Sequence, residues 1–432
     1  MPAPPKSPAD LRRAHLVRRG LLVLTLVNLL NYLDRFLVSA LVESLRAEMR
    51  LDGFRLGMLQ TAFIVVYMAA SPIFGTLGDR VSRTRLLCLG VALWSAATTV
   101  SGFARGFIGL FVGRAAVGVG EAAYGAIAPS LLADYYPQSK RGRVFAVFFS
   151  AIPIGAALGY VLGGLIDHRY GWRAAFYVAG VPGLLLAVFT LWLWDPPRGV
   201  HDAESAGPSR SGGLAATYGR LFRNGPFMLT VAGYAAYTFG VGAMAFWMPA
   251  FLERCRGIPR EAATVQFGLV VVVTGFVGTF AGGWLGDALL RRNRQAYLWV
   301  SGGSALLAAP VVALALTASS PVVLWSGMVM AELLLFASTG PVNSALVEQV
   351  SAWERASAVG LTNFAIHLFG DVPSPPLIGA ISDASSLERA VLLVPASVLV
   401  SGVIWCWAAW VASSLPGVRR ADPPPAAGRG QV

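Results

Sequence analysis

The segment GTLGDR (residues 75–80) ends an apolar stretch and leads into the basic residues Arg83 and Arg85. The segment GGWLGD (residues 282–287) ends another apolar stretch, and a basic cluster at residues 291–294 follows it. Both segments contain Gly-x-x-Gly-Asp before a basic turn, and they lie about half a chain apart. This recurrence predicts two copies of one helical unit, an arrangement that lets two bundles rock about a central site.

The composition indicates that lipid surrounds much of this chain. The 432 residues are 56% hydrophobic and only 13% charged, whereas soluble domains carry about 25% charged residues. A spanning helix needs roughly 20 mostly apolar residues, and twelve stretches qualify. They cover about 17–41, 54–78, 85–104, 107–135, 141–166, 173–194, 226–252, 261–289, 296–317, 320–347, 355–382 and 388–414.

The longest polar segment, residues 195–224, divides the twelve stretches into halves at residues 17–194 and 225–415. Its Pro, Gly, Ser and charged residues are typical of a flexible linker. Residues 1–16 are expected to form a cytoplasmic tail, and residues 416–432 a disordered cytoplasmic tail. Most of the 34 Lys and Arg residues lie on the side of the termini, so the termini are predicted to be cytoplasmic. The predicted fold class is an all-α membrane protein with twelve transmembrane helices in two pseudo-symmetric six-helix bundles.

Four ionisable residues fall deep inside the first half, where a charge costs at least about 2.5–3.5 kcal/mol to insert. Asp34 and Arg35 lie in the first stretch, and Arg114 and Glu121 in the fourth. Adjacent residues project about 100° apart on a helix, so Asp34 and Arg35 cannot face one partner equally. Our hypothesis is that Asp34 pairs with Arg114 across a central cavity in one protonation state. Glu121 and Arg35 complete the predicted proton-coupling group.

The alternative is that these four residues form fixed pairs that only hold helices together. Glu121 would then brace the cavity wall, and Arg35 would be a lock to a neighbouring helix. In the second half, Glu332 lies within the tenth stretch, and His367 and Asp371 lie four residues apart on the eleventh. Residues with that spacing share a helix face. His367 and Asp371 could form a second proton site or a hydrogen bond that fixes a Pro-kinked helix.

Several classes of function are disfavoured. The net charge of +12 is spread over short loops, which indicates contact with anionic lipid rather than nucleic acid. The three cysteines offer no disulfide framework, and no Cys/His cluster has metal-ligand spacing. The pair Gly118 and Gly120 lies inside a span, so it is no phosphate cradle. No enzyme chemistry, cofactor or metal is expected, and energy is expected to come from an ion gradient.

The chain resembles the major facilitator superfamily, because the loop that begins at Gly75 and the run Arg114-x-x-x-Gly118-x-Gly120 are similar to its loop motif and its fourth-helix motif. Within that superfamily it most resembles the spinster family of lysolipid and sphingosine-phosphate transporters. The matching stretches are NYLDR (31–35), VGVGEA (117–122), IAP (127–129), AIPIG (151–155), GAMAFW (242–247) and HLFGDVPSP (367–375).

This resemblance implies proton-linked or gradient-linked movement of an amphipathic, phosphate-bearing lipid, and protons are the expected coupling ion. Two other readings stay open: a proton-linked importer of a small organic anion such as a sugar acid, and a receptor or scramblase built on the same fold. The chain is expected to act as a monomer in a bacterial inner membrane, with a small-molecule substrate, protons and membrane lipids as its partners.

The same resemblance implies two sets of site residues. Cytoplasmic gate residues are expected to latch helices together and to affect cycling more than binding. They are Asp79, Arg80, Arg83, Arg143 and Asp287. An apolar cavity wall suits an acyl chain, and the predicted cavity residues are Tyr124, Tyr237, Phe246, Glu332, Asn343, His367 and Asp371.

Overall fold

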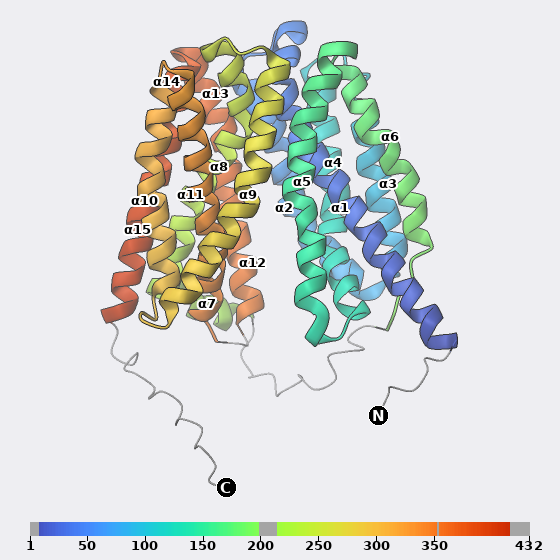
Figure 1. The fold of residues 1–432 in the computed structure, drawn as a ribbon. Helices are drawn as coiled ribbons and strands as arrows, with labels where there is room; N and C mark the ends of the chain where they lie inside the picture. The colour runs from blue at the N-terminus through green and yellow to red at the C-terminus, as the bar shows by residue number, and fades with distance from the viewer. Residues whose placement is uncertain (1–7, 198–213, 352–353, 415–432) are drawn as a thin grey trace.

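The structure is a computed structural model that describes residues 8–197, 214–351 and 354–414 (Figure 1). Within those ranges the chain forms helices and loops, and no strand. The first six helices are α1 (Pro8–Met49), α2 (Gly53–Arg80), α3 (Arg83–Ser101), α4 (Phe107–Tyr135), α5 (Gln138–Tyr170) and α6 (Trp172–Leu191). The others are α7 (Leu214–Arg223), α8 (Gly225–Arg256), α9 (Arg260–Leu290), α10 (Ala296–Thr317), α11 (Pro321–Glu348), α12 (Arg355–Ile366), the π-helix η1 (His367–Asp371), α13 (Ser374–Ala384), α14 (Leu387–Ala390) and α15 (Leu393–Ser414).

Eleven segments of the described chain are long and apolar enough to cross a membrane. They correspond to eleven of the twelve predicted stretches, and the predicted all-α fold class is confirmed. The stretch predicted at 355–382 is different, because α12, η1 and α13 divide it into three pieces. Proline explains part of this division: Pro373, Pro375 and Pro376 have no N–H to donate, so the helical hydrogen-bond ladder cannot run through them.

Local sequence signals explain where several helices begin and end. The Asp52 side chain accepts a 2.7 Å hydrogen bond from the Arg55 amide and caps α2. Asn224 caps α8 in the same way through the Phe227 amide, at 3.2 Å. Gly257 ends α8 in the left-handed conformation at φ 65°, which glycine adopts without steric cost. Between such ends the backbone groups bond within their own helix, as lipid requires.

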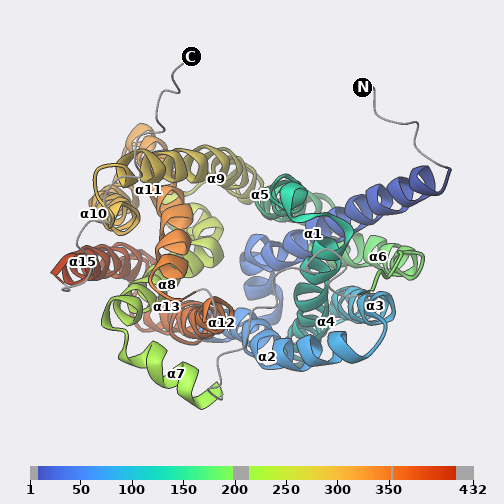
Figure 2. The ribbon, with the colours of Figure 1, turned by 90° about the horizontal axis from the view of Figure 1, so that it is seen from below.

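The long helices form two groups that lie side by side. Helices α1–α6 lie on one side, and α8–α15 lie on the other (Figures 1 and 2). The described part of the predicted N-terminal tail is helical, because α1 begins at Pro8. The described part of the predicted linker contains α7, whose Leu221 is buried against the second group. Residues 1–7, 198–213 and 415–432 lie outside the described residues, so the exact domain boundaries stay a prediction.

Both described ends of the chain, Pro8 and Ser414, lie at one face of the molecule, which we call the termini face (Figure 1). The two groups of helices make their direct polar contacts with each other toward the opposite face. There, Arg254 of α8 forms an ion pair with Glu43 of α1. Arg260 of α9 approaches Asp167 of α5 at 3.1 Å.

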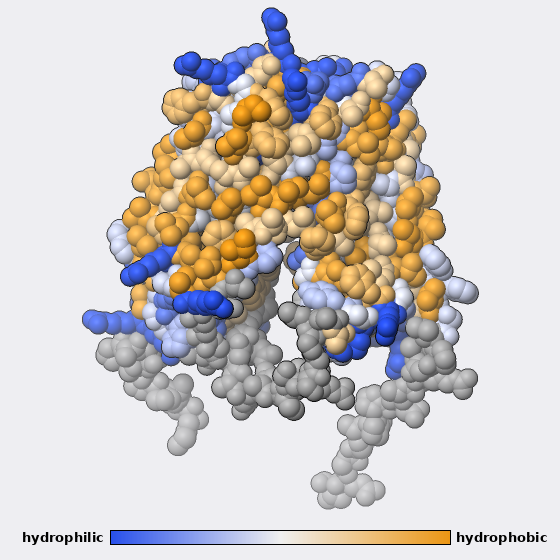
Figure 3. Space-filling model, turned by 180° about the vertical axis from the view of Figure 1, so that it is seen from behind, coloured by the Kyte–Doolittle hydropathy of each residue, from blue (hydrophilic) through white to orange (hydrophobic). Residues whose placement is uncertain are grey.

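Backbone contacts reinforce this closure. The Asp383 carboxylate on α13 accepts hydrogen bonds from the Gly53 and Phe54 amides of α2, at 2.9 and 3.0 Å. Gly57 lies so close to Pro375 that a Cβ there would collide with the facing backbone. Toward the termini face, the molecule is hollowed between the two groups (Figure 3). The described conformation is therefore closed at the face opposite the termini.

A side chain at Gly57 is expected to force the closed face apart. We predict that Gly57→Ala lengthens the distance between spin labels at Arg55 and Ser385, because the added Cβ has no room against the backbone of Pro375. Pulsed electron resonance on the detergent-solubilised protein measures that distance. Gly303→Ala is the matched control, since nothing lies within 4 Å of a Cβ at Gly303. An unchanged distance in Gly57→Ala would contradict the prediction.

Candidate functional site

A cavity of about 320 Å³ lies between the two groups of helices. Its wall is mostly aromatic and aliphatic, with a few polar groups that converge on it, which is the usual composition of a small-molecule site. The lining residues include Tyr32, Arg35, Phe36, Gln60, Phe63, Tyr67, Tyr234, Tyr237, Val241, Phe246, Phe336, His367 and Asp371. Because both halves contribute, movement of one half against the other must change the shape of this cavity.

Arg35 is the one arginine among the residues that line this cavity, and it is held from two directions. Its Nε lies 2.6 Å from the Glu121 Oε2 on α4. The rings of Tyr32, Phe63 and Tyr67 surround the guanidinium, with centroids 5.0, 5.1 and 4.8 Å away. A cation within about 6 Å of an aromatic face is attracted to it. Arg35 is therefore positioned to present positive charge to the cavity.

The pairing of Asp34 with Arg114 in one protonation state stays a prediction. These two residues form no direct ion pair among the described contacts, and the pair that forms instead is Arg35 with Glu121. The reason is the helical offset between neighbours: α1 turns Arg35 toward α4 and Asp34 toward α3. There the Asp34 Oδ2 accepts a 2.7 Å hydrogen bond from Thr98. The alternative prediction, that Arg35 bridges to a neighbouring helix, describes the observed contact.

Several polar atoms in this cluster are buried without a partner among the described residues. They are the Asp34 Oδ1, the Glu121 Oε1, and the Nε and Nη1 of Arg114. The third Arg114 nitrogen, Nη2, lies 3.5 Å from the Gln60 Oε1. Buried polar groups without partners are uncommon and often mark functional or hydrated positions. The first half thus contains two acids and two bases that are only partly satisfied by one another.

His367 and Asp371 both lie in η1, and the predicted hydrogen bond between them is present. The His367 Nδ1 is 2.8 Å from the Asp371 Oδ2. The His367 ring also meets the ring of Tyr67 edge-on, with centroids 6.4 Å apart. Single π-helical turns inside α-helices are rare and frequently lie at functional sites. The break in the eleventh stretch therefore presents both side chains to the cavity.

Three of the predicted cavity residues do not line the cavity. Tyr124 is buried in the first half and donates a 2.6 Å hydrogen bond to the Leu24 carbonyl. Glu332 is buried in α11, and none of the described residues bonds to its carboxylate. Asn343 is exposed and donates to the Tyr234 hydroxyl at 3.2 Å. The other four predicted residues, Tyr237, Phe246, His367 and Asp371, line the cavity.

Sequence reasoning did not select several residues that the cavity uses, among them Gln60, Tyr67 and Tyr234. A usable signal was present for some of them. Phe63 and Tyr67 are four residues apart, and Tyr234 and Tyr237 are three apart, so each pair shares one helix face. Gln60 gave no such signal, because a glutamine near a helix end is ordinary in sequence.

The predicted gate residues lie toward the termini face, and those described act within one half. Arg83 is buried, forms an ion pair with Asp134, and lies 2.8 Å from Asp195. Asp287 accepts a 2.7 Å hydrogen bond from Tyr297 of the neighbouring helix α10. Arg80 and Arg143 are exposed, and the side chain of Asp79 lies outside the described residues. Their role as conformational latches stays a prediction.

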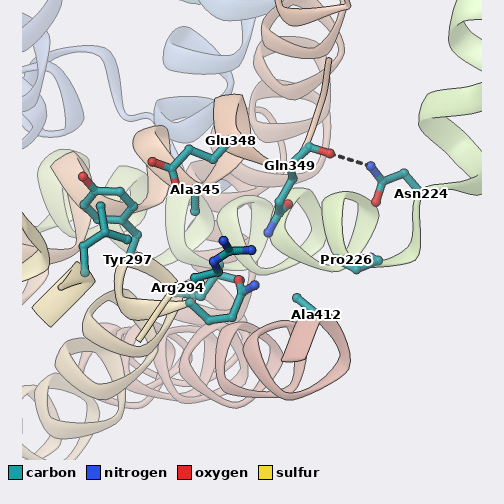
Figure 4. Close-up of a pocket in the computed structure, with 11 residues that line it drawn as sticks. Asn224, Pro226, Arg294, Tyr297, Ala345, Glu348, Gln349 and Ala412 are labelled. Carbon is teal, nitrogen blue, oxygen red and sulfur yellow. Dashed lines mark hydrogen bonds between the residues drawn. The ribbon is translucent and has the colours of Figure 1, made fainter. Parts of the chain in front are cut away.

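A second cavity, of about 600 Å³, lies at the termini face of the second half (Figure 4). Asn224 spans part of its rim and donates a 2.8 Å hydrogen bond to the Gln349 carbonyl, while Arg294 and Tyr297 lie on other sides. All of its lining residues come from the second half. The central cavity differs from it, because residues of both halves line the central cavity.

Comparisons with known proteins agree with this geometry. The family profile of the Major Facilitator Superfamily matches residues 24–372. A solved structure of a bacterial homolog of the human lysosomal transporter spinster aligns with a TM-score of 0.84 at 22% identity, over 91% of this chain and 97% of that one. A nucleoside transporter aligns with a TM-score of 0.71 at 13% identity, over 90% and 99%. At these identities the two structures show the fold alone.

The chain is thus a transporter of the major facilitator superfamily, and its curated relatives identify the branch. It is 36% identical to the mouse protein spinster homolog 1 over 84% of this chain and 72% of that protein. It is 33% identical to the protein spinster of Drosophila melanogaster, again over 84% of this chain. The match spans 61% of the Drosophila protein's length. The chain belongs to the spinster family and is an integral membrane protein with a small-molecule substrate.

The Arg35–Glu121 pair is expected to behave as a buried unit. Removing one partner leaves the other charge buried and unpaired, so we predict that Arg35→Met and Glu121→Met each lower stability by about 3–5 kcal/mol. The double variant is expected to recover much of that loss, because it leaves neither charge of the pair behind. Thermal unfolding in detergent measures all three variants. Strictly additive losses in the double variant would show that the two side chains do not depend on each other.

Proposed function

We propose that this protein is a proton-coupled carrier that moves an amphipathic, lipid-like molecule of the lysolipid or sphingosine-phosphate type by alternating access. The observation that carries the proposal is the Arg35–Glu121 pair at the cavity wall. One carboxylate oxygen of Glu121 in that pair has no partner among the described residues. A cavity that presents an arginine suits an anionic headgroup, and a carboxylate that the arginine releases can accept a proton.

The coupling step follows from competition for Arg35. Arg35 is partly accessible, with 19% of its side chain exposed, whereas Glu121 is fully buried. An anionic headgroup that enters the cavity reaches Arg35 and competes with Glu121 for the same guanidinium. A buried carboxylate that loses its cation favours the protonated form, since desolvation disfavours its charge. Asp34, which has an unpartnered oxygen of its own, holds or passes on the same proton, while the guanidinium of Arg114 stays charged beside it.

The cavity wall favours an amphipathic cargo over a fully polar one. Phe36, Phe246 and Phe336 give it an apolar surface on both sides, while the polar groups gather around Arg35 and His367. Its volume of about 320 Å³ holds a headgroup and the first part of a chain. The rest of an acyl chain would extend into the hollow between the two groups of helices (Figure 3).

One observation favours the second possible function, a proton-coupled symporter of a small organic anion such as a sugar acid. The cavity is small, and Arg35, Gln60 and His367 together could bind a carboxylate without any acyl chain. The absence of a second cavity-lining arginine among the described residues weighs against it, because small polyanions are usually held by paired bases.

The charge distribution supports an orientation with the termini face in the cytoplasm of a bacterial plasma membrane. The exposed arginines Arg80, Arg143, Arg291 and Arg292 lie toward that face, and cytoplasmic loops carry an excess of Lys and Arg. The closed face would then be the outer one, and the carrier would work as a monomer.

Proton coupling is tested in proteoliposomes with an imposed pH gradient. We expect Glu121→Gln and Asp34→Asn to lose pH-driven accumulation of cargo but to retain exchange of cargo down its own gradient, because an amide cannot cycle a proton. Glu261→Gln, which changes a partly exposed carboxylate 3.5 Å from His168, is the matched control and should keep full pH dependence. Unchanged pH dependence in both Glu121→Gln and Asp34→Asn would contradict the proposed coupling role.

The class of cargo is tested by binding. We expect a lysophospholipid to bind the purified protein and a sugar acid to compete weakly or not at all. Arg35→Gln should weaken lysolipid binding by at least about tenfold, since hydrogen bonds to charged groups contribute about 1.5–3 kcal/mol. Phe336→Ala should weaken binding of long-chain cargo more than short-chain cargo. Preferential binding of the sugar acid would favour the symporter instead.

A further inference from the structure

We propose that the break between η1 and α13 forms a sodium-ion site, built from the Asp371 carboxylate, the Asp371 carbonyl and the Ser374 hydroxyl. This site goes beyond the proposed function, which assigns protons as the coupling ion and the neighbouring cavity to cargo. Discontinuous membrane helices commonly use unwound backbone carbonyls to coordinate Na⁺ or protons. The break at residues 371–374 supplies such a backbone in this chain.

Two side-chain oxygens converge on one small region beside Gly242 of α8. A Cβ placed on Gly242 would lie 2.6 Å from the Asp371 Oδ1 and 3.4 Å from the Ser374 Oγ. Both oxygens therefore lie beside Gly242, where a side chain would collide with the Asp371 carboxylate. A small cation that bridges these two oxygens would supply each with the partner that it lacks among the described residues.

Neither the Ser374 Oγ nor the Asp371 Oδ1 receives a hydrogen bond from a described residue. Ser374 is fully buried, and its Oγ has no hydrogen-bond partner among the described residues. The Asp371 Oδ2 is occupied by His367 at 2.8 Å, but no described group donates to Oδ1. A buried hydroxyl without a partner is costly, and a bound ion or water commonly supplies the missing partner.

The third oxygen is the Asp371 backbone carbonyl. In a regular helix the amide four residues later would bond to it, but that residue is Pro375, and the next is Pro376. Neither has an N–H to donate. The Val372 carbonyl, which the same prolines also leave free, is instead satisfied by the Thr61 hydroxyl at 2.6 Å. No side chain among the described residues donates a hydrogen bond to the Asp371 carbonyl in the same way.

The chemistry of this set points to a monovalent hard cation. All three ligands are oxygens, which suit hard cations rather than zinc or copper. Only one carboxylate contributes, and calcium sites usually collect more negative charge and more oxygens. Cys/His spacing in the sequence gives no signal for such a site, because its ligands are one acid, one hydroxyl and one carbonyl.

The test is Na⁺ binding to the full-length protein in detergent. We expect ²²Na⁺ to bind the purified wild-type protein, and NaCl to raise its melting temperature above that in equal concentrations of KCl or choline chloride. Ligands that bind only the folded state stabilise it in this way. The measurement is made at a fixed, mildly alkaline pH, where an ordinary histidine is neutral. A wild-type protein that binds no ²²Na⁺ overturns the proposal without reference to any variant.

Variants locate the site. Ser374→Ala removes one ligand, and Gly242→Ala places a Cβ against the Asp371 Oδ1. Each is expected to weaken Na⁺ binding by at least about tenfold, as loss of metal-site partners typically does. Ser385→Ala and Gly303→Ala are the matched controls and should bind as the wild type does, since Ser385 is exposed and a Cβ at Gly303 meets nothing. Full Na⁺ binding in both site variants would place the ion elsewhere and overturn the assignment.

Discussion

Hydrocarbon offers no hydrogen-bond partner to a peptide group, and this constraint governs the whole molecule. Most of the described spanning segments satisfy this constraint because they are continuous helices whose backbone groups bond internally. The helical ladder is interrupted at η1, and there the chain borders the central cavity. Buried charge obeys the same rule: Arg35 satisfies Glu121, while Asp34 and Arg114 keep atoms without partners. The polar groups around the central cavity therefore lie where the constraint is met least completely.

Much of the architecture could be predicted because it depends on properties that are local in sequence. Apolar stretches of sufficient length specify spans, and Gly-x-x-Gly-Asp before a basic turn revealed the repeat. The intramembrane charges were equally visible. The sequence did not show which of these charges pair with each other, because a rotation of α1 by one residue exchanges Asp34 for Arg35 in front of α4. Contacts such as Glu43 with Arg254 were also invisible, since they join residues that are far apart in sequence and depend on the conformation.

The two halves share an architecture but differ in their buried ionisable residues. The first half concentrates two acids and two bases near Arg35, where formal charge is balanced. The second half places a histidine and an aspartate on an interrupted helix, and keeps Glu332 buried without a bonded partner among the described residues. Duplicated units that diverge in this way can assign different steps to different halves. One half can respond to the charge of the cargo while the other changes the course of its backbone.

The close approach of Gly53 and Gly57 to α13 has a consequence for the cost of cycling. Surfaces that meet through bare backbone immobilise few side chains, so closure forfeits little rotamer entropy, which otherwise costs about 0.5–1.5 kcal/mol per long side chain. When α2 and α13 separate, few side chains likewise have to leave pockets in the facing helix. A carrier must visit both of its conformations at similar free energy. A seam with few interdigitated side chains is a simple means of keeping the two conformations in balance.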